Sequence, residues 1–225
     1  MSAKPRSPFR ILAMIVLVGL IVVVGGLTLI GAVETLTITA FPARPKGQPK
    51  VGLIAGHWQN DSGATCPDGL EEVDLNLAIA RRVAYILRKQ GYSVEILPEF
   101  SPRLNGYRAD ALLAIHNDSC VQDLSGFKVA RMTHASDPEV EDRLVQWLYQ
   151  TYAEATGLVP HPDTITEDMR EYHALRQIAP ETPGAIIECG FMGGDRHLLT
   201  QEQDRVAVGI ANGLIAFLRE QGRVP

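Results

Sequence analysis

Val51-Gly52-Leu53-Ile54-Ala55-Gly56-His57 is an apolar run that ends at a glycine and a histidine. A continuous apolar run of this length is typical of a strand that is covered on both faces. Such a strand would place the His57 imidazole at the carboxyl edge of a sheet, where open α/β folds build their sites. His57 is therefore a candidate ligand of a catalytic metal ion.

Apolar strands and amphipathic helices alternate along residues 50–225. A short helix is also expected near residues 168–178, within a segment from 157 to 183 that is rich in proline and charge. Strands that alternate with helices predict an α/β fold, in which a mixed, largely parallel sheet is sandwiched by helices. The expected strands are 50–56, 92–97, 111–115, 126–132 and 184–189, and the expected long helices are 69–90, 138–156 and 201–221.

An uncharged segment, Ile11 to Val33, precedes this domain. Its 23 residues, at about 1.5 Å each, are enough to cross a hydrocarbon core of about 30 Å. Lys4, Arg6 and Arg10 precede it without an acid, which favours a cytoplasmic N-terminus and an extracytoplasmic domain. A cleaved signal peptide is the alternative, although its apolar region is usually about 7–15 residues long. The expected organisation is a cytoplasmic N-terminus (1–10), one transmembrane helix (11–33), a linker (34–49) and one catalytic domain (50–225).

The domain that follows the apolar segment is acidic. The formal net charge of the chain is −5, and Lys4, Arg6 and Arg10 contribute +3 before the first acid, so residues 34–225 carry −8. Nucleic-acid binding depends on clustered Lys and Arg. The charge therefore argues against a nucleic-acid partner.

Three of the expected strands end at a side chain that can bind a metal or transfer a proton: His57, His116 and Glu188. A histidine at a strand end is more often a hydrogen-bonded structural residue than a ligand, and a glutamate there is often a surface residue. Three such endings in one small sheet favour a shared site. Two imidazoles and one carboxylate are the ligand set typical of a catalytic zinc.

A carboxylate ligand is expected at the start of the helix that follows His57, where Glu71 and Glu72 are adjacent. Asp68 and Glu71 have the spacing of a capping box, which gives Glu71 a structural role. Glu72 instead falls on the apolar stripe that faces the sheet, and a carboxylate there is costly without a positive partner. Stabilisation of an acid by the helix dipole is the alternative, but it does not require the buried face. Glu72 is therefore preferred; the stripe contains Leu75, Ile79, Val83, Ile86 and Leu87.

The three cysteines, Cys66, Cys120 and Cys189, are too few for a disulfide framework. Cys66 and Cys120 each follow a candidate ligand by a short stretch, so in an exported domain they either pair or are simply small buried residues. Cys189 adjoins Glu188, and on a strand it would point to the opposite face.

At these residues the chain resembles the zinc-dependent N-acetylmuramoyl-L-alanine amidases, which hydrolyse peptidoglycan. Gly56-His57 and Asp61-Ser62-Gly63-Ala64 are similar to their Gly-His-Gly-Gly-x-Asp-x-Gly-Ala segment. Four motifs occur in the right order over about residues 50–220 and are specific together. The second is Glu72-Val-Asp-Leu-Asn-Leu-Ala78, which is similar to Glu-Lys-Asp-x-Asn-Leu-Ala. The third runs from Ala109-Asp110 through Ile115-His116 and is similar to Ala-Asp…Ser-Ile-His. The fourth is Ile187-Glu-Cys-Gly-Phe191, which is similar to Val-Glu-x-Gly-Phe.

The resemblance implies that His57, Glu72 and His116 hold zinc and that Glu188 is the catalytic base and acid. Glu188 ends an apolar run, so burial should raise its pKa toward a value that suits proton transfer. The implied reaction is cleavage of the amide between N-acetylmuramic acid and L-alanine, on the outer side of a bacterial membrane to which a single-pass helix anchors the domain. The alternatives are a zinc peptidase or amidohydrolase for another acylated peptide, and an inactive wall-binding or regulatory domain.

Five positions depart from the family pattern. The glycine pair after the first histidine is Trp58-Gln59, and the acid before that histidine is Ile54. Asp118 and Gly194 each replace an asparagine. The three proposed zinc ligands and the proposed catalytic glutamate are all retained. These departures therefore bear on substrate recognition more than on metal binding. Among the other histidines, His173 is a candidate for the wall of the cleft. The sequence does not determine the oligomeric state.

Overall fold

The computed structural model describes residues 47–225. Their centre is a five-stranded sheet in the order β2-β1-β3-β5-β4, in which all neighbours are parallel except β4, which is antiparallel to β5. The predicted α/β class with a mixed, largely parallel sheet is confirmed. The strands are β1 (Lys50–Ala55), β2 (Ser93–Pro98), β3 (Ala111–Asp118), β4 (Lys128–Ala130) and β5 (Gly184–Phe191).

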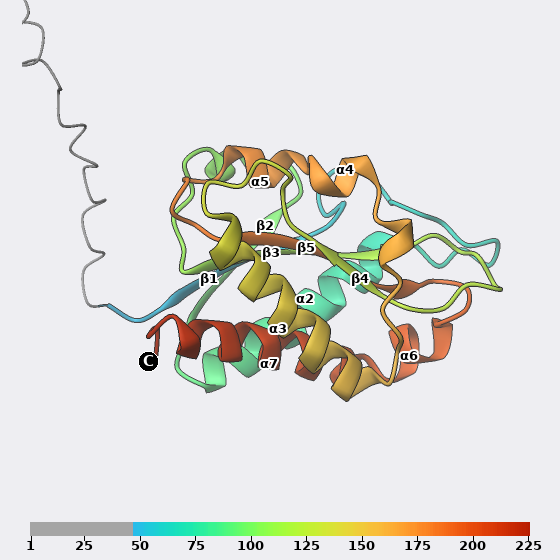
Figure 1. The fold of residues 1–225 in the computed structure, drawn as a ribbon. Helices are drawn as coiled ribbons and strands as arrows, with labels where there is room; N and C mark the ends of the chain where they lie inside the picture. The colour runs from blue at the N-terminus through green and yellow to red at the C-terminus, as the bar shows by residue number, and fades with distance from the viewer. Residues whose placement is uncertain (1–46) are drawn as a thin grey trace, which may run out of the picture. The chain divides into compact units, whose positions relative to one another are not determined.

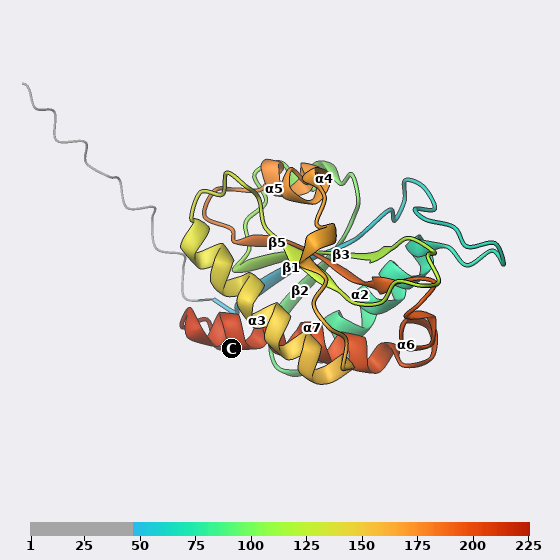
Figure 2. The same ribbon diagram turned by 45° about the vertical axis from the view of Figure 1, so that its right-hand side comes forward.

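Helical segments cover both faces of the sheet (Figure 1). The long helices α2 (Glu72–Lys89), α3 (Pro138–Thr156) and α7 (Gln203–Glu220) lie below the sheet in this view. The opposite face is covered by the short helices α4 (Glu167–Arg170) and α5 (His173–Gln177) and by the 3-10 turn η1 (Pro102–Leu104). Figure 2 shows the same layers from another side, with α6 (Arg196–Gln201) near the end where the loops project. The turn η2 (Pro162–Thr164) precedes α4.

The strand sequences explain these two layers, because alternate residues of a strand point to opposite faces. Leu113 and Ile115 of β3 pack in the large core with the long helices, and each such buried side chain contributes about 1.5–3 kcal/mol. Leu112 and Ala114 pack in the smaller core on the other face. His116 continues this second set, so its imidazole emerges on the face that α4 and α5 cover.

Helix α2 begins at Glu72 rather than at residue 69, and the predicted capping box is wrong. Glu71 occupies the N-cap position without a side-chain hydrogen bond, and Asp68 pairs with Arg196 instead. Thr65 and Glu71 form an antiparallel bridge, so the chain between them folds back as a turn. Residues within that turn cannot also form the first turn of a helix.

Other boundaries also differ from the prediction. The expected helix at 201–221 corresponds to α7 alone, and α6 precedes it as a separate short helix. The expected helix near 168–178 is divided into α4 and α5. Strands β3 and β5 continue to Asp118 and Phe191, so His116 and Glu188 lie within strands rather than at their ends. The carboxyl half of each strand therefore carries the candidate residue.

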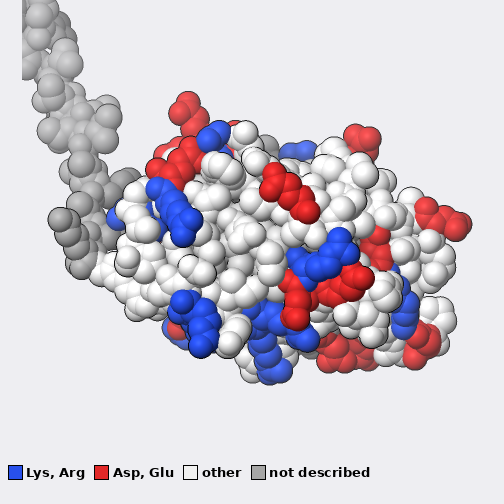
Figure 3. Space-filling model, turned by 90° about the horizontal axis from the view of Figure 1, so that it is seen from below, with Lys and Arg blue, Asp and Glu red and all other residues white. Residues whose placement is uncertain are grey.

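The lower face of the molecule has acidic and basic side chains in mixed order (Figure 3). Ion pairs join the long helices: Arg143 of α3 pairs with Glu220 of α7, and Arg82 of α2 pairs with Asp204 of α7. Charges mixed in this way do not form a continuous basic surface for a nucleic-acid backbone on that face.

Within residues 47–225, no helix combines the length and the apolar character needed to cross a bilayer. The predicted transmembrane segment, Ile11–Val33, lies outside the described residues. The N-terminal segment 1–10 and most of the linker 34–49 also lie outside them. The membrane anchor and the domain boundaries stay predictions.

Candidate active site

His57 follows β1 in a left-handed backbone conformation, with φ 65°. Its backbone N–H donates to Glu99 Oε2 at 2.9 Å. Its imidazole Nδ1 lies 2.5 Å from Asp61 Oδ1, and Nε2 lies 3.3 Å from Glu72 Oε2. The Gly63 N–H helps to hold the pKa of Asp61 below its usual range, so this carboxylate can only accept. Nδ1 therefore carries a proton, and Asp61 fixes the direction in which the ring points.

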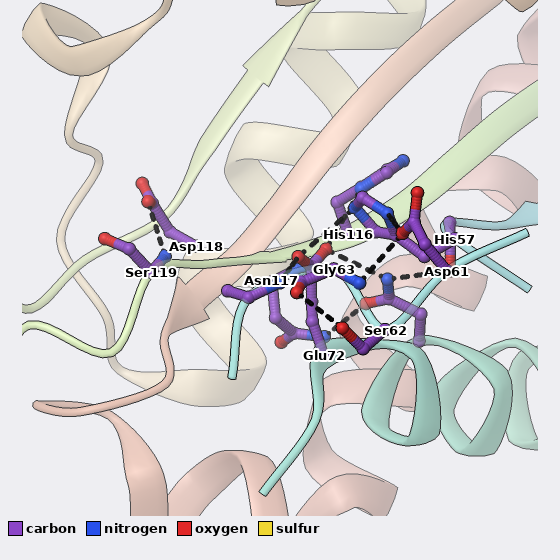
Figure 4. Close-up of polar contacts among 12 residues, drawn as sticks. His57, Asp61, Ser62, Gly63, Glu72, His116, Asn117, Asp118 and Ser119 are labelled. Carbon is purple, nitrogen blue, oxygen red and sulfur yellow. Dashed lines mark hydrogen bonds and ion pairs between the residues drawn. The ribbon is translucent and has the colours of Figure 1, made fainter. Parts of the chain in front are cut away.

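Glu72 extends from the start of α2 toward both imidazoles and is 5% exposed (Figure 4). Its Oε1 lies 3.0 Å from His116 Nδ1, and its Oε2 accepts from the Ala64 N–H at 3.0 Å. Burial would raise the pKa of Glu72, but hydrogen bonds with His116 and His57 outweigh burial and hold this pKa well below its usual range. The position of Glu72 is the one that the helix-face argument predicts.

His116 lies in β3 with 7% of its surface exposed. Gly56 makes room for its ring, because a Cβ there would lie 2.4 Å from His116 Nε2. Nε2 is 3.3 Å from the Tyr172 hydroxyl oxygen and 3.6 Å from Glu99 Oε2. Burial would lower the pKa of His116, but Glu72 and Glu99 outweigh burial and raise it to about 10. The surrounding negative charge therefore favours a positive group at this place.

The structure brings His57, Glu72 and His116 into one cluster, with one potential ligand atom from each residue within 4.8 Å of the others. This donor set is that of a catalytic zinc, which binds such atoms at about 2.0–2.2 Å and keeps one position open. Gly63 lines the cluster, and a Cβ there would lie 2.6 Å from Glu72 Oε2. The donors, the glycine beside them and the negative charge all fit a divalent cation.

Glu188 lies beside this cluster. It pairs in register with His116 of β3 on one side and with Lys128 of β4 on the other. Residues paired in this way point to the same face of a sheet, so the three side chains form a row. Burial raises the pKa of Glu188 to about 7, and its buried Oε2 has no hydrogen-bond partner among the described residues. A carboxyl group with this pKa is suited to exchange a proton with a reacting group.

Two departures from the family pattern have structural explanations. Asp118 replaces an asparagine, and its Oδ2 lies 2.5 Å from the buried ammonium of Lys128, which also donates to the Thr164 carbonyl at 2.9 Å. Gly194 replaces another asparagine, and a Cβ there would lie only 1.9 Å from the Leu124 carbonyl oxygen. The added charge is therefore paired, and loop backbone fills the space of the lost side chain.

Cys66 and Cys120 form a disulfide with their Cα atoms 5.4 Å apart, and Cys189 is a buried free thiol. Cys66 belongs to the loop between β1 and α2, and Cys120 follows β3. Cys189 packs in the large core, on the face opposite Glu188, as predicted. The disulfide therefore joins the two loops that follow His57 and His116.

Sequence reasoning missed Glu99 and Tyr172 and gave Asp61 no role. Glu99 directly follows β2 at the same edge of the sheet as His57. A search for acids and histidines at the ends of all the expected strands would therefore have found it. Asp61 is in the quoted motif, but the spacing alone did not assign its contact. Tyr172 lies in the segment 157–183, where no periodicity indicated a contact with the site. His173, the candidate for the cleft wall, is half-buried and bonds to Glu99.

Solved structures share this fold. The chain is similar to the catalytic domain of CwlV, an N-acetylmuramoyl-L-alanine amidase from Bacillus (Paenibacillus) polymyxa var. colistinus, at 23% identity and a TM-score of 0.59, over 76% of this chain and 99% of that one. An N-acetylmuramoyl-L-alanine amidase from Clostridium difficile 630 gives 23% identity and a TM-score of 0.62, over 78% and 99%. AmiC2 of Nostoc punctiforme, also an amidase of this name, gives 24% identity and a TM-score of 0.59, over 78% and 99%.

The search of curated proteins gave no match. The family model described as N-acetylmuramoyl-L-alanine amidase matches residues 51–216, which include His57, Glu72, His116 and Glu188. This match covers most of the chain. The chain belongs to the N-acetylmuramoyl-L-alanine amidase family.

Proposed function

We propose that the chain is a zinc-dependent hydrolase that cleaves the amide bond between N-acetylmuramic acid and L-alanine in peptidoglycan. One observation carries the proposal: the cluster of His57, Glu72 and His116 lies beside the carboxyl group of Glu188, whose buried Oε2 has no hydrogen-bond partner among the described residues. Family membership supports the substrate class, and the donor set of the cluster supports the metal.

His57, Glu72 and His116 would hold the zinc ion. When bound, zinc supplies Lewis acidity, which polarises a carbonyl group and makes water more acidic. Asp61 keeps the His57 ring oriented by accepting from Nδ1. Glu72 keeps its negative charge, because its bonds to both histidines favour the ionised form.

Glu188 would move the proton. As a carboxylate it takes a proton from the attacking water at its buried Oε2, while the water oxygen forms a bond to the amide carbon. It then returns this proton to the alanine nitrogen as the carbon–nitrogen bond breaks. The products are a lactyl carboxylate and a stem peptide with a free amino group. Its pKa of about 7 allows both transfers near neutral pH.

We further propose that the domain acts outside a bacterial membrane, anchored by residues 11–33. The support is the uncharged segment with the basic residues before it, together with the Cys66–Cys120 disulfide, because disulfides are typical of oxidising compartments.

The test is digestion of purified peptidoglycan by the zinc-loaded chain, followed by mass analysis of the products and detection of new amino termini. We expect free L-alanine amino termini and intact glycan strands, and no release after a chelator removes the metal. Cleavage only at peptide bonds within the stem would support a zinc peptidase instead. Wall binding without cleavage would support an inactive wall-binding domain.

A further inference from the structure

Glu99 is a buried carboxylate that joins three segments of the site. It follows β2, is 5% exposed, and receives the His57 backbone N–H at Oε2. Its other oxygen, Oε1, accepts from the Tyr172 hydroxyl at 2.7 Å and lies 2.7 Å from His173 Nε2. A buried carboxylate is costly unless donors meet it. Here the donors come from the end of β1 and from the chain around α5.

Glu99 also acts on the His116 ring. The Tyr172 hydroxyl donates its hydrogen to Glu99 Oε1 at 2.7 Å. The Tyr172 oxygen is then free to accept from His116 Nε2, which lies 3.3 Å away. With Nε2 held toward Tyr172, the other ring nitrogen, Nδ1, faces Glu72 Oε1 at 3.0 Å. The chain of contacts from Glu99 through Tyr172 thus sets which nitrogen of His116 faces the cluster.

The two histidines of the cluster are therefore oriented in opposite ways. Asp61 accepts directly from Nδ1 of His57, so that Nε2 of this ring faces Glu72. Glu99 holds Nε2 of His116 through Tyr172 and leaves Nδ1 toward Glu72. Carboxylates behind metal-bound histidines commonly fix the ring orientation and raise metal affinity.

We propose that Glu99 is a positioning residue, which holds the His57 backbone and, through Tyr172, presents Nδ1 of His116 to the metal. The inference rests on the proposed function, since it assumes that the cluster binds zinc. It assigns Glu99 no contact with the substrate.

Glu95 provides a matched control. It lies in β2, the strand that Glu99 follows, four residues before Glu99, and its carboxylate also accepts hydrogen bonds. Its partners are Tyr107 at 2.9 Å, Lys50 at 3.1 Å and Arg103, none of which belongs to the cluster. Glu95→Gln therefore removes a carboxylate of β2 without changing the contacts of His57 or His116.

The experiment compares the full chain with Glu99→Gln and Glu95→Gln. Zinc affinity is measured by competition with a chromophoric chelator, and the cobalt-substituted proteins are compared by visible absorption. Glu99→Gln should bind zinc about 10–100-fold more weakly and change the cobalt spectrum. Glu95→Gln should match the wild type in both. Thermal unfolding of the metal-free proteins separates loss of orientation from loss of fold.

Tyr172→Phe is the second variant, because it keeps the carboxylate and the aromatic ring but removes the connecting hydroxyl. It should weaken zinc binding less than Glu99→Gln, since the bond to the His57 N–H remains. If Glu99→Gln does not fold, a weakened zinc affinity and altered cobalt spectrum in folded Tyr172→Phe support the inference. If Glu99→Gln folds and has the zinc affinity and cobalt spectrum of the wild type, the inference is overturned. If only Tyr172→Phe folds, the same result in that variant overturns the inference.

The proposed function fails separately. If the wild type binds zinc but does not cleave peptidoglycan, the amidase proposal is wrong, and the affinity comparison still decides the role of Glu99. If the wild type binds neither zinc nor cobalt, both proposals are wrong.

Discussion

A partly buried glutamate lies near each end of β5, and burial raises the pKa of both to about 7. Glu188 lies toward the carboxyl end, in a row with His116 and Lys128. Glu141 of α3 lies at the amino end, where its Oε1 is 3.4 Å from the Gly184 N–H. Within the described residues, neither Oε2 has a hydrogen-bond partner.

The comparison shows that a buried carboxyl group with a raised pKa does not by itself make a site. The other charges that act on the pKa of Glu141 are those of Arg131, Asp137 and Asp142. These residues lie in the segment between β4 and α3 and in α3 itself. Near Glu188, side chains from three strands and one helix meet. Function is inferred from this convergence, because desolvation raises the pKa of the glutamate at both ends.

The largest expected effect is on the cluster beside Glu188. His57→Ala should lose bound zinc and lower the rate of peptidoglycan hydrolysis by about 10³-fold or more, because several kcal/mol of transition-state stabilisation depend on the metal. Metal analysis and a hydrolysis assay measure both. His197→Ala, at an exposed histidine of α6, is the control and should keep both. Full activity of the metal-free protein would contradict the account.

The disulfide should matter for stability at the site end of the sheet. Cys120→Ser opens a link between residues that are 54 positions apart, and should lower the free energy of unfolding by about 2–4 kcal/mol. Urea unfolding measures this change. A reducing agent should destabilise the wild type similarly and leave the variant unchanged. If the reductant destabilises both proteins equally, its effect on stability does not come from the Cys66–Cys120 disulfide.

Glu141 should affect stability and leave catalysis unchanged. Between pH 4.5 and about 7, the folded protein keeps a proton on Glu141 that the unfolded chain has lost, so its contribution to the free energy of unfolding falls as the pH rises through this window. Glu141→Gln removes this slope. It should be more stable than the wild type by about 1–3 kcal/mol at pH 8 and similar to it near pH 4.5. Identical pH slopes in the two proteins would contradict this assignment.

The positive charge of Lys128 should lower the pKa of Glu188. Burial raises the pKa of Glu188, and the positive charge of Lys128 partly opposes this shift. The acid limb of the kcat/KM profile should lie at or below about pH 7, because a bound cation lowers this pKa further. Lys128→Gln should move the limb to higher pH and reduce activity several-fold at pH 6. An unshifted limb in a folded variant would show that Lys128 does not act on the base.

The sequence predicted the parts of the site that depend on local patterns. The apolar runs before His57, His116 and Glu188 located three strands, and helical periodicity selected Glu72. The capping box at Asp68 failed because the same residues also form a turn closed by Thr65 and Glu71.

The contacts between distant segments could not be predicted in this way. Tyr172 meets Glu99 across 73 positions, and no local pattern links an aromatic residue in an irregular segment to the end of another strand. The sequence leaves the pairing of Cys66 with Cys120 open for the same reason. Both depend on how the loops fold over the sheet edge, which tertiary packing determines.

The most direct test compares the two glutamates near β5 in one assay. Zinc-loaded wild type, Glu188→Gln and Glu141→Gln are incubated with purified peptidoglycan, and free L-alanine amino termini are counted over time. Glu188→Gln should be slower by about 10²–10⁴-fold while it still binds zinc, because general acid–base catalysis typically contributes that factor. Glu141→Gln should release stem peptides at the wild-type rate. Equal release by zinc-bound Glu188→Gln and the wild type would contradict the central claim.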